Sequence, residues 1–239
     1  MTASAFRWRA VAAAFGRVLL PQHCSLCGDE AGARALCRRC VAELPRWPAA
    51  VCPLCALPAH SGELCGRCQK ARPAFDHTLA VFDYAFPVDR LVHALKYRQQ
   101  LSLAPFLGAE LAAAGAHLAP TIDCILPMPL HPGRLAERGF NQAVEIARPL
   151  ARASALRLEL AAVRKLRDTP AQASLERARR LRAPRDAFRC IHPLDGQRVL
   201  VIDDVMTTGA TLNELARCLK AAGAAWVGNL VLARTPSPG

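Results

Sequence analysis

Cysteine is the residue type whose spacing points most directly to chemistry in this chain. Eight of the eleven cysteines lie between Cys24 and Cys68, where they form four C-x2-C pairs. The unit C-x2-C-x9-C-x2-C occurs twice, and the second copy begins 28 residues after the first. Each pair directs two sulfurs at one point, and two pairs supply the four thiolates of a tetrahedral Zn2+ site. Disulfides and redox-active pairs are the alternatives, but a redox C-x2-C motif is typically a single pair in a βαβ context.

We therefore predict two structural zinc ions, because a segment of about 45 residues is too small to be stabilised by its own core. Sequential pairing of the cysteines is the simpler arrangement, although spacing alone also permits alternate pairs to interleave. The expected ligands are Cys24, Cys27, Cys37 and Cys40 for one site, and Cys52, Cys55, Cys65 and Cys68 for the other. Whether this module also contacts nucleic acid is left open.

A second pattern combines two acids with a loop rich in threonine. The apolar run Val199–Ile202 is followed by Asp203, Asp204, Val205, Met206, Thr207, Thr208, Gly209, Ala210 and Thr211. Glycine lets a main chain approach a ligand closely, and the N–H groups at a helix start bind phosphate. The acids can accept hydrogen bonds from a vicinal diol such as that of ribose. The segment contains neither a Walker A motif nor G-x-G-x-x-G. It therefore favours a 5-phosphoribosyl group as ligand, and the alternative is a threonine-rich helix cap with solvated acids.

Basic residues are the third candidate group, since the chain has 31 Lys and Arg against 19 Asp and Glu. Arg134 and Arg138 lie in the polar segment after the second predicted strand, as cations that suit a phosphate ligand. Lys96 follows a predicted helix and either reaches the same cleft or is an ordinary cation at a helix C-terminus. His131 is better explained as a group that orders its loop than as a general base. Residues 164–189 carry nine Arg and Lys and three acids, which fits a lid, a nucleic-acid surface or a solvated face.

These groups must be positioned by alternating strands and helices. We predict strands at 78–84, 122–128, 199–202 and 226–232, and a polar loop at 129–139. We predict helices from Pro87 through Leu95, at 103–117, at 140–153 with Pro149 ending or kinking it, and at 211–222 capped by Gly223. Strand, helix and strand in succession form a βαβ unit, which implies a parallel sheet. The fold class is α/β.

Composition and the N-terminus set the remaining limits. A chain that is 52% hydrophobic, with a mean hydropathy of +0.14, is not disordered, and no stretch of 18 apolar residues is free of charge, which argues against a transmembrane segment. Residues 1–20 resemble a signal peptide in part, but Arg17 interrupts the apolar run, so an amphipathic helix is the better interpretation. We expect a cytoplasmic protein with reduced thiols. The predicted domains are a helix at 1–21, a double zinc ribbon at 22–72, an α/β domain at 73–234 and a flexible tail at 235–239.

The segment VLVIDDVMTTGATL resembles the phosphoribosyl pyrophosphate (PRPP) signature of type I phosphoribosyltransferases, and PMPLHPGRLAERGFNQA looks like a block of the ComF family. Cysteine pairs ahead of such a domain are also that family's architecture. The resemblance implies a type I phosphoribosyltransferase-like parallel sheet flanked by helices and preceded by a small zinc-ribbon module. It implies that Asp203 and Asp204 hold the ribose hydroxyls and that residues 206–211 hold the 5-phosphate. Asp203, Asp204 and Arg138 are the catalytic candidates, and residues 203–211 with Lys96 are the PRPP-binding candidates.

The family's hood over the active site is represented by Arg164, with Thr169 and Gln172 displaced slightly further on, but no Asn follows in RRLRAPRDAF. Two functions from different classes follow. One is a PRPP-binding protein of the ComF type, which the resemblance links to DNA uptake in natural competence, with single-stranded DNA and competence DNA-transport proteins as partners. The other is a phosphoribosyltransferase of nucleotide salvage that joins a nucleobase to PRPP and releases pyrophosphate, with Mg2+ bound to PRPP. The acceptor base is not legible in the sequence.

Overall fold

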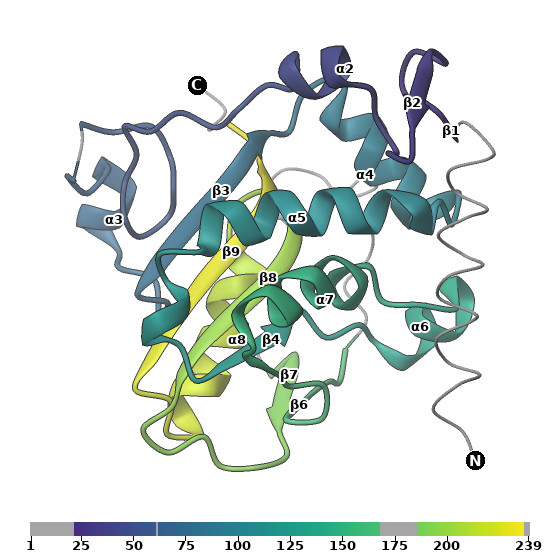
Figure 1. Ribbon diagram of the computed structural model, residues 1–239. Coiled ribbons are helices and arrows are strands. Elements are labelled where there is room, and N and C mark those ends of the chain that lie inside the picture. The colour runs from purple at the N-terminus through teal and green to yellow at the C-terminus, as the bar shows by residue number, and fades with distance from the viewer. Residues whose placement is uncertain (1–21, 61, 168–185, 237–239) are drawn as a thin grey trace, which may run out of the picture. The chain divides into compact units, whose positions relative to one another are not determined.

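The computed structural model describes residues 22–60, 62–167 and 186–236 (Figure 1). Main-chain contacts divide the chain into two compact units between Leu44 and Pro45. The second cysteine unit therefore belongs to the same compact unit as the α/β sheet, whereas the first does not. The predicted N-terminal helix at 1–21 lies outside the described residues, as does the end of the predicted tail.

The first unit is small and is organised around its cysteines. Strands β1 (Gln22–His23) and β2 (Glu30–Gly32) pair antiparallel, and the short helix α2 (Arg38–Ala42) follows. At the first turn, Gly28 has a φ of +78°, and its N–H donates to the carbonyl of Cys24 at 2.9 Å. The unit therefore has the short turns that a zinc knuckle requires.

The second unit contains a five-stranded sheet in which every pair of neighbouring strands is parallel. The order across the sheet is β3 (His77–Asp83), β9 (Trp226–Arg234), β8 (Arg198–Met206), β4 (Cys124–Pro127) and β5 (Arg157–Leu158). The run Val199–Ile202 in the central strand is no more than 1% exposed, as a strand covered on both faces requires. The predicted α/β fold with a parallel sheet is confirmed.

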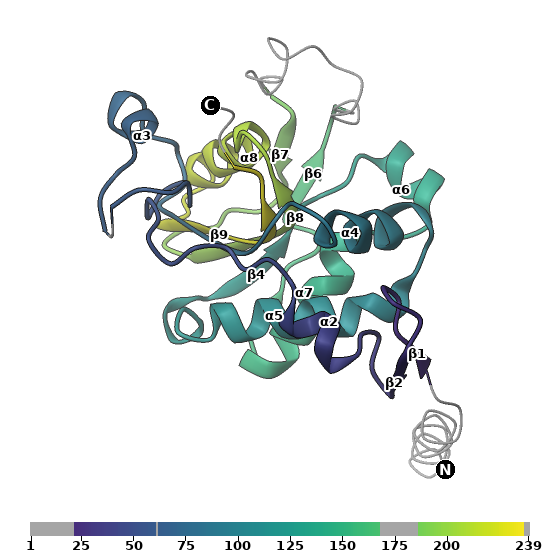
Figure 2. The same ribbon diagram turned by 90° about the horizontal axis from the view of Figure 1, so that it is seen from above.

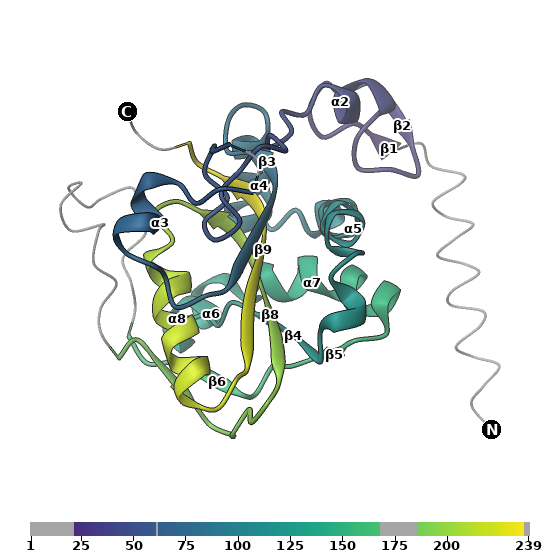
Figure 3. The same cartoon turned by 90° about the vertical axis from the view of Figure 1, so that its left-hand side faces the viewer.

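Helices cover both faces of this sheet. Figure 3 shows α5 (Ala104–Gly115) and α7 (Gln142–Ser154) on one side and α8 (Ala210–Ala221) on the other. Helix α8 connects β8 to β9 and confirms the predicted βαβ unit. Gly223 follows α8 with a φ of +97°, and its N–H donates to the carbonyl of Lys220, which confirms the predicted cap. The other helical elements are α3 (Gly66–Lys70), α4 (Val88–Tyr97), η1 (Leu101–Leu103) and η2 (Ala119–Thr121).

The prediction of a loop at 129–139 is wrong, because Pro132–Arg138 forms the helix α6. His131 caps this helix, since its Nδ1 accepts a hydrogen bond from the N–H of Gly133 at 3.2 Å. Pro132 occupies the first helical position, where its missing N–H costs nothing, and Gly139 ends the helix with a φ of +80°. Of the two prolines and two glycines that favoured a loop, Pro132 and Gly139 are thus the start and stop signals of a short helix.

Pro149 does not end its helix, because α7 continues to Ser154. The ring lies against α5 at a glycine: a Cβ added at Gly108 would stand 2.5 Å from Cγ of Pro149. Packing between α5 and α7 therefore holds the proline inside the helix, and it outweighs the local preference of proline to break it. The central strand also differs from its prediction, since β8 extends to Met206 and includes both Asp203 and Asp204.

A two-stranded antiparallel hairpin, β6 (Val163–Lys165) and β7 (Phe188–Cys190), flanks the segment predicted to form the hood. Figure 2 shows this hairpin beside α8. Arg164 lies in β6, while Thr169, Gln172 and most of the basic run fall outside the described residues. No helix among the described residues is long and apolar enough to cross a membrane.

Candidate phosphoribosyl site and cysteine clusters

The acidic and threonine-rich segment lies at the carboxyl end of the central strand, where open α/β sheets bind ligands. Gly209 turns the chain between β8 and α8 with a φ of +78°, a conformation that glycine adopts without strain. Thr208 supports the helix start, since its Oγ1 accepts from the N–H of Ala210 at 3.3 Å. The segment is therefore a strand–turn–helix junction, as a phosphate-binding loop requires.

A cleft of about 590 Å3 opens beside this junction. Its walls come from the end of β3, α4, the segment around α6, the start of α7, β6 and the β8–α8 junction. The lining residues are Tyr84, Val92, His93, Lys96, Tyr97, Met128, Leu130, His131, Arg134, Arg138, Gln142, Lys165, Asp203 to Leu212, and Thr235. The structure thus brings all the residues predicted for PRPP binding, and Arg138, to one cleft.

Lys96 lies in the last turn of α4, and its Nζ is 2.8 Å from Oδ1 of Asp204. Asp204 is 3% exposed, and its second oxygen, Oδ2, has no hydrogen-bond partner among the described residues. A buried carboxylate oxygen is costly without a donor, so it marks a place where a polar ligand can bind. Lys96 therefore belongs to the cleft and is more than a cation at a helix end.

The neighbouring acid, Asp203, has a raised pKa. Burial, and after it the charge of Asp204, raise the pKa of Asp203 to about 7. Burial opposes the ammonium of Lys96, but the charge of Asp204 and the hydrogen bond between them raise the pKa of Lys96 above its ordinary value. The charge of Asp204 thus contributes to the raised pKa values of both Asp203 and Lys96, and Asp203 changes charge near neutral pH.

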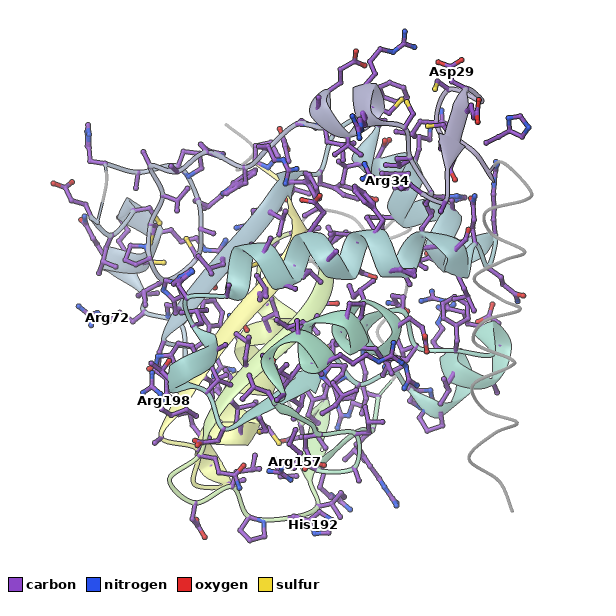
Figure 4. All side chains as sticks on the ribbon, viewed as in Figure 1. Asp29, Arg34, Arg72, Arg157, His192 and Arg198 are labelled. Atoms are coloured by element: carbon purple, nitrogen blue, oxygen red, sulfur yellow. The ribbon has the colours of Figure 1, made fainter. Side chains whose placement is uncertain are left out.

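Cations from α6 face the same cleft. Arg138 donates to Oε1 of Gln142, and its guanidinium carbon lies 5.4 Å from the ring centre of Tyr97. The cations at the other end of the sheet are separate: Figure 4 shows Arg157 and Arg198, which begin β5 and β8, near the end of the sheet that is opposite the cleft. The cleft therefore has acids on its central strand and arginines on a neighbouring helix.

Sequence reasoning missed several lining residues, chiefly His93 and Tyr97. His93 precedes Lys96 by three residues on α4, and Tyr97 follows His93 by four, with their rings 4.8 Å apart. Helical spacing around Lys96 could have identified them. No sequence pattern marks Tyr84 and Thr235 as cleft residues, because they reach the cleft only through the pairing of β3 and β9.

The two cysteine units each form one cluster. In both, the four sulfurs lie within 4.8 Å of one another, and the members are Cys24, Cys27, Cys37 and Cys40 in one and Cys52, Cys55, Cys65 and Cys68 in the other. Sequential pairing is therefore confirmed. Burial opposes the thiolates of Cys24 and Cys52, but main-chain N–H groups of the knuckles outweigh it and lower their pKa values to about 6 and about 7. Four converging sulfurs, one of them in each cluster with a stabilised thiolate, fit Zn2+.

Two family descriptions match this chain. Residues 15–69 match the double zinc ribbon domain, and residues 135–239 match the phosphoribosyl transferase domain. The DNA utilization protein YhgH of Escherichia coli O6:H1 is 37% identical over 191 residues, which cover 77% of this chain and 84% of that protein. The chain belongs to the ComF family. Competence protein F of Haemophilus influenzae is 27% identical, over 79% of this chain and 85% of its own. Competence protein ComFC of Bacillus subtilis is 28% identical, over 84% of each chain.

A more distant likeness exists among solved structures. The glutamine PRPP amidotransferase from B. subtilis aligns with 55% of this chain and 26% of its own, at 22% identity and a TM-score of 0.38. The family assignment therefore depends on the sequence relatives and the two domain matches. For this ComF-family chain, the predicted zinc ribbons and the phosphoribosyltransferase-like fold are both shown, while the roles of individual cleft residues stay predictions.

Proposed function

We propose that this ComF-family protein binds PRPP, with Mg2+, in the cleft at the end of β8. The observation that carries the proposal is the unpartnered Oδ2 of the buried Asp204, which lies next to a glycine turn at a helix start. A carboxylate in need of a donor suits a ribose hydroxyl, and N–H groups at a helix start suit a phosphate. PRPP carries ribose hydroxyls and a 5-phosphate on the same sugar.

Mg2+ fits the same residues, because carboxylate and hydroxyl oxygens are the ligands it prefers. Asp203, Asp204 and the threonine hydroxyls provide such oxygens, and the ion would neutralise charge on the pyrophosphate. Arg134 and Arg138 from α6 would bind the far side of the pyrophosphate. Positioning and charge stabilisation are then the work of the protein, and no covalent intermediate with the chain is required.

Calorimetry with PRPP and Mg2+ tests this directly. Asp204→Asn should weaken binding by about 1.5–3 kcal/mol, the value of a hydrogen bond to a charged group, or roughly tenfold to a hundredfold. Thr208→Ala should cost less, because the main-chain N–H groups remain. Asp195→Asn is the matched control, since Asp195 is an exposed carboxylate outside the cleft. Folded, zinc-replete protein that shows no heat of binding with millimolar PRPP and Mg2+ contradicts the proposal.

The biological setting is proposed from the relatives. Proteins named for DNA utilization and for competence align with this chain over most of their length, so we propose a cytoplasmic role in DNA uptake, with single-stranded DNA and DNA-transport proteins as partners. The arginines expected to contact DNA are Arg177, Arg179, Arg180 and Arg182, all outside the described residues. Binding should fall steeply with rising salt, because phosphate contacts release counterions. Affinity that does not depend on salt, or that survives replacement of the four arginines by Ser, contradicts this assignment.

The second candidate is catalysis in nucleotide salvage, favoured by the arginines that face the cleft from α6. In that reaction a nitrogen of a nucleobase bonds to C1 of PRPP while the bond to pyrophosphate breaks. Release of pyrophosphate in a screen of nucleobases with PRPP and Mg2+ identifies the reaction and its acceptor. PRPP binding without any release of pyrophosphate leaves the protein as a PRPP-dependent binding protein.

A further inference from the structure

Three consecutive carbonyl groups of the candidate phosphate loop are held by arginine side chains. Nη1 of Arg234 donates to the carbonyl of Met206 at 3.0 Å and to the carbonyl of Thr207. Nη2 of Arg67 donates to the carbonyl of Thr208 at 2.7 Å. The peptide bonds of this loop are trans, and in a trans peptide the N–H points opposite to the C=O. The N–H groups of the following residues, 207–209, therefore point away from the two guanidinium groups.

Both arginines are connected to the second cysteine cluster. Arg67 lies in α3 between Cys65 and Cys68, two of the cluster's members. Arg234 ends β9, and its Nε donates to the carbonyl of Cys55 at 3.2 Å. The backbone of this cysteine cluster and the backbone of the loop are thus joined by two independent side chains within one compact unit.

The second cysteine cluster and the loop also share one hydrophobic core. Cys52, Cys55 and Cys68 belong to the buried cluster of apolar residues that contains Met206 of the loop and Leu212 of α8. The chain that leaves the cysteine unit is fixed to α8 as well, since the side-chain oxygen of Asn213 accepts from the N–H of Ala74 at 2.7 Å. The second cysteine unit is therefore packed as part of the α/β domain.

The buried charge of Arg234 is a further link between the loop and the second cysteine cluster. Its side chain is 1% exposed, none of the described carboxylates forms an ion pair with it, and its Nη2 has no hydrogen-bond partner among the described residues. A buried cation without a counter-charge is strongly unfavourable. Zn2+ held by four thiolates is a dianionic centre, and Arg234 already bonds to the main chain of one of its ligands. A zinc ion held by Cys52, Cys55, Cys65 and Cys68 would supply the missing negative charge.

We propose that the second cysteine cluster is a working part of the phosphoribosyl site, in which zinc fixes Arg67 and Arg234 and these positioning residues orient the N–H groups of residues 207–209 for a phosphate. This inference rests on the proposed binding of PRPP. It gives the two zinc ribbons different roles, because loss of zinc from the second one lowers affinity for PRPP. The first ribbon stabilises its own unit.

The repeat offers a matched control for Arg67, since Arg39 stands 28 residues earlier, at the same place in its knuckle. Arg67 is exposed, so Arg67→Met should leave zinc content and folding unchanged while it weakens PRPP binding about fivefold to tenfold. Arg67→Lys, which retains a charged donor, should recover part of the affinity. Arg39→Met should have no effect, because Arg39 pairs with Asp29 in the other unit.

Hydrogen exchange of the loop amides in the absence of PRPP separates this inference from the proposed function. Arg67→Met should accelerate exchange at residues 207–211, and Arg39→Met should not. If wild-type protein binds no PRPP, the proposed function fails, yet the exchange result still reports whether Arg67 orders the loop. Unchanged exchange together with unchanged PRPP affinity in Arg67→Met overturns the inference.

A second pair of variants tests the zinc itself. Cys37→Ser and Cys65→Ser change the same position of the two units, and both residues are half-buried. Each variant should lose about one zinc ion per chain, but only Cys65→Ser should weaken PRPP binding and accelerate exchange in the loop. Equal effects of the two substitutions contradict the assignment. If Cys65→Ser does not fold, the comparison of Arg67→Met with Arg39→Met decides.

Discussion

Replacement of Lys96 by Met is the change whose consequences follow most directly from the structure. Met keeps most of the apolar stem and removes the charge that lies 2.8 Å from Asp204. The side chains of Lys96 and Asp204 are only 20% and 5% exposed, so water cannot replace the lost partner. The variant leaves a buried carboxylate beside a second one, at the centre of the sheet's carboxyl end.

The magnitude can be worked out from this burial. Removing one partner of a buried ion pair costs about 3–5 kcal/mol, and the partial exposure of Lys96 favours the lower end, about 3 kcal/mol. For a unit of this size each kcal/mol shifts the melting temperature by about 2–4 °C, so the variant should melt about 6–12 °C lower. Asp204→Asn in the same chain removes the unpaired charge, and the double variant should recover about 1–3 kcal/mol.

The pH dependence has a definite sign. The charge of Lys96 lowers the pKa of Asp203, which burial and Asp204 hold at about 7, so Lys96→Met raises this pKa further. A carboxyl whose pKa is higher in the folded state contributes stability that is lost as pH rises through the folded-state pKa. In wild-type protein this loss is nearly complete by pH 8, whereas in Lys96→Met it continues. The difference in free energy of unfolding between the two proteins should therefore be larger at pH 8 than at pH 6.

Urea unfolding of zinc-replete protein, followed by circular dichroism at pH 6 and pH 8, measures both effects. Lys70→Met is the matched control, because Lys70 is an exposed lysine of the same unit, and it should change the free energy of unfolding by less than about 0.5 kcal/mol. The reasoning is refuted if Lys96→Met costs less than about 1 kcal/mol and shows no coupling to Asp204→Asn. A destabilisation that is smaller at pH 8 than at pH 6 refutes the electrostatic part alone.

Four further outcomes are expected. Protein purified without added metal should contain about two zinc ions per chain by elemental analysis, and an absence of zinc would rule out the ribbons. Gly209→Val should abolish PRPP binding by calorimetry and lower the melting temperature, because a β-branched residue is strained at a φ of +78° and its side chain would stand where a phosphate approaches the loop; retained binding contradicts the close approach. PRPP affinity should rise between pH 6 and 8 as Asp203, with a pKa of about 7, gains its charge, and Asp203→Asn should flatten that profile. A hydrogen bond between the sulfurs of Cys190 and Cys218, which are 3.2 Å apart, lowers the pKa of Cys218 to about 7, so iodoacetamide should modify Cys218 readily at pH 7.5 and more slowly in Cys190→Ala; equal rates would exclude this activation.

Much of the chemistry could be predicted from the sequence because its determinants are local. The four sulfurs of each cluster come from 17 consecutive residues, so two short turns suffice to bring them together. The order of strand, acids, glycine and helix is also contiguous from Val199 to Ala221, and a junction of this kind forms wherever β8 and α8 form. The βαβ unit and the parallel sheet followed from the same periodicities.

The positions of proline and glycine gave a misleading indication of secondary structure at α6 and α7. The prolines and glycines around α6 favour a loop as well as helix ends, and the choice depended on the cap provided by His131. Pro149 stays helical because Gly108 on α5 leaves room for its ring. The first contact comes from the residue that precedes the helix and the second from another helix, and the content of proline and glycine shows neither.

Only the tertiary structure decided which distant side chains complete the site. Lys96 and Asp204 are far apart in the chain, and they meet because the C-terminal end of α4 reaches the carboxyl end of β8. Arg67 and Arg234 reach the same loop from a zinc knuckle and from the end of β9. No periodicity or spacing encodes these meetings, because they depend on the order of strands in the sheet. The sequence by itself determined the eight paired cysteines and the contiguous strand–turn–helix junction, whereas the fold determined how the cysteines group and that one of the two clusters shares a core with that junction.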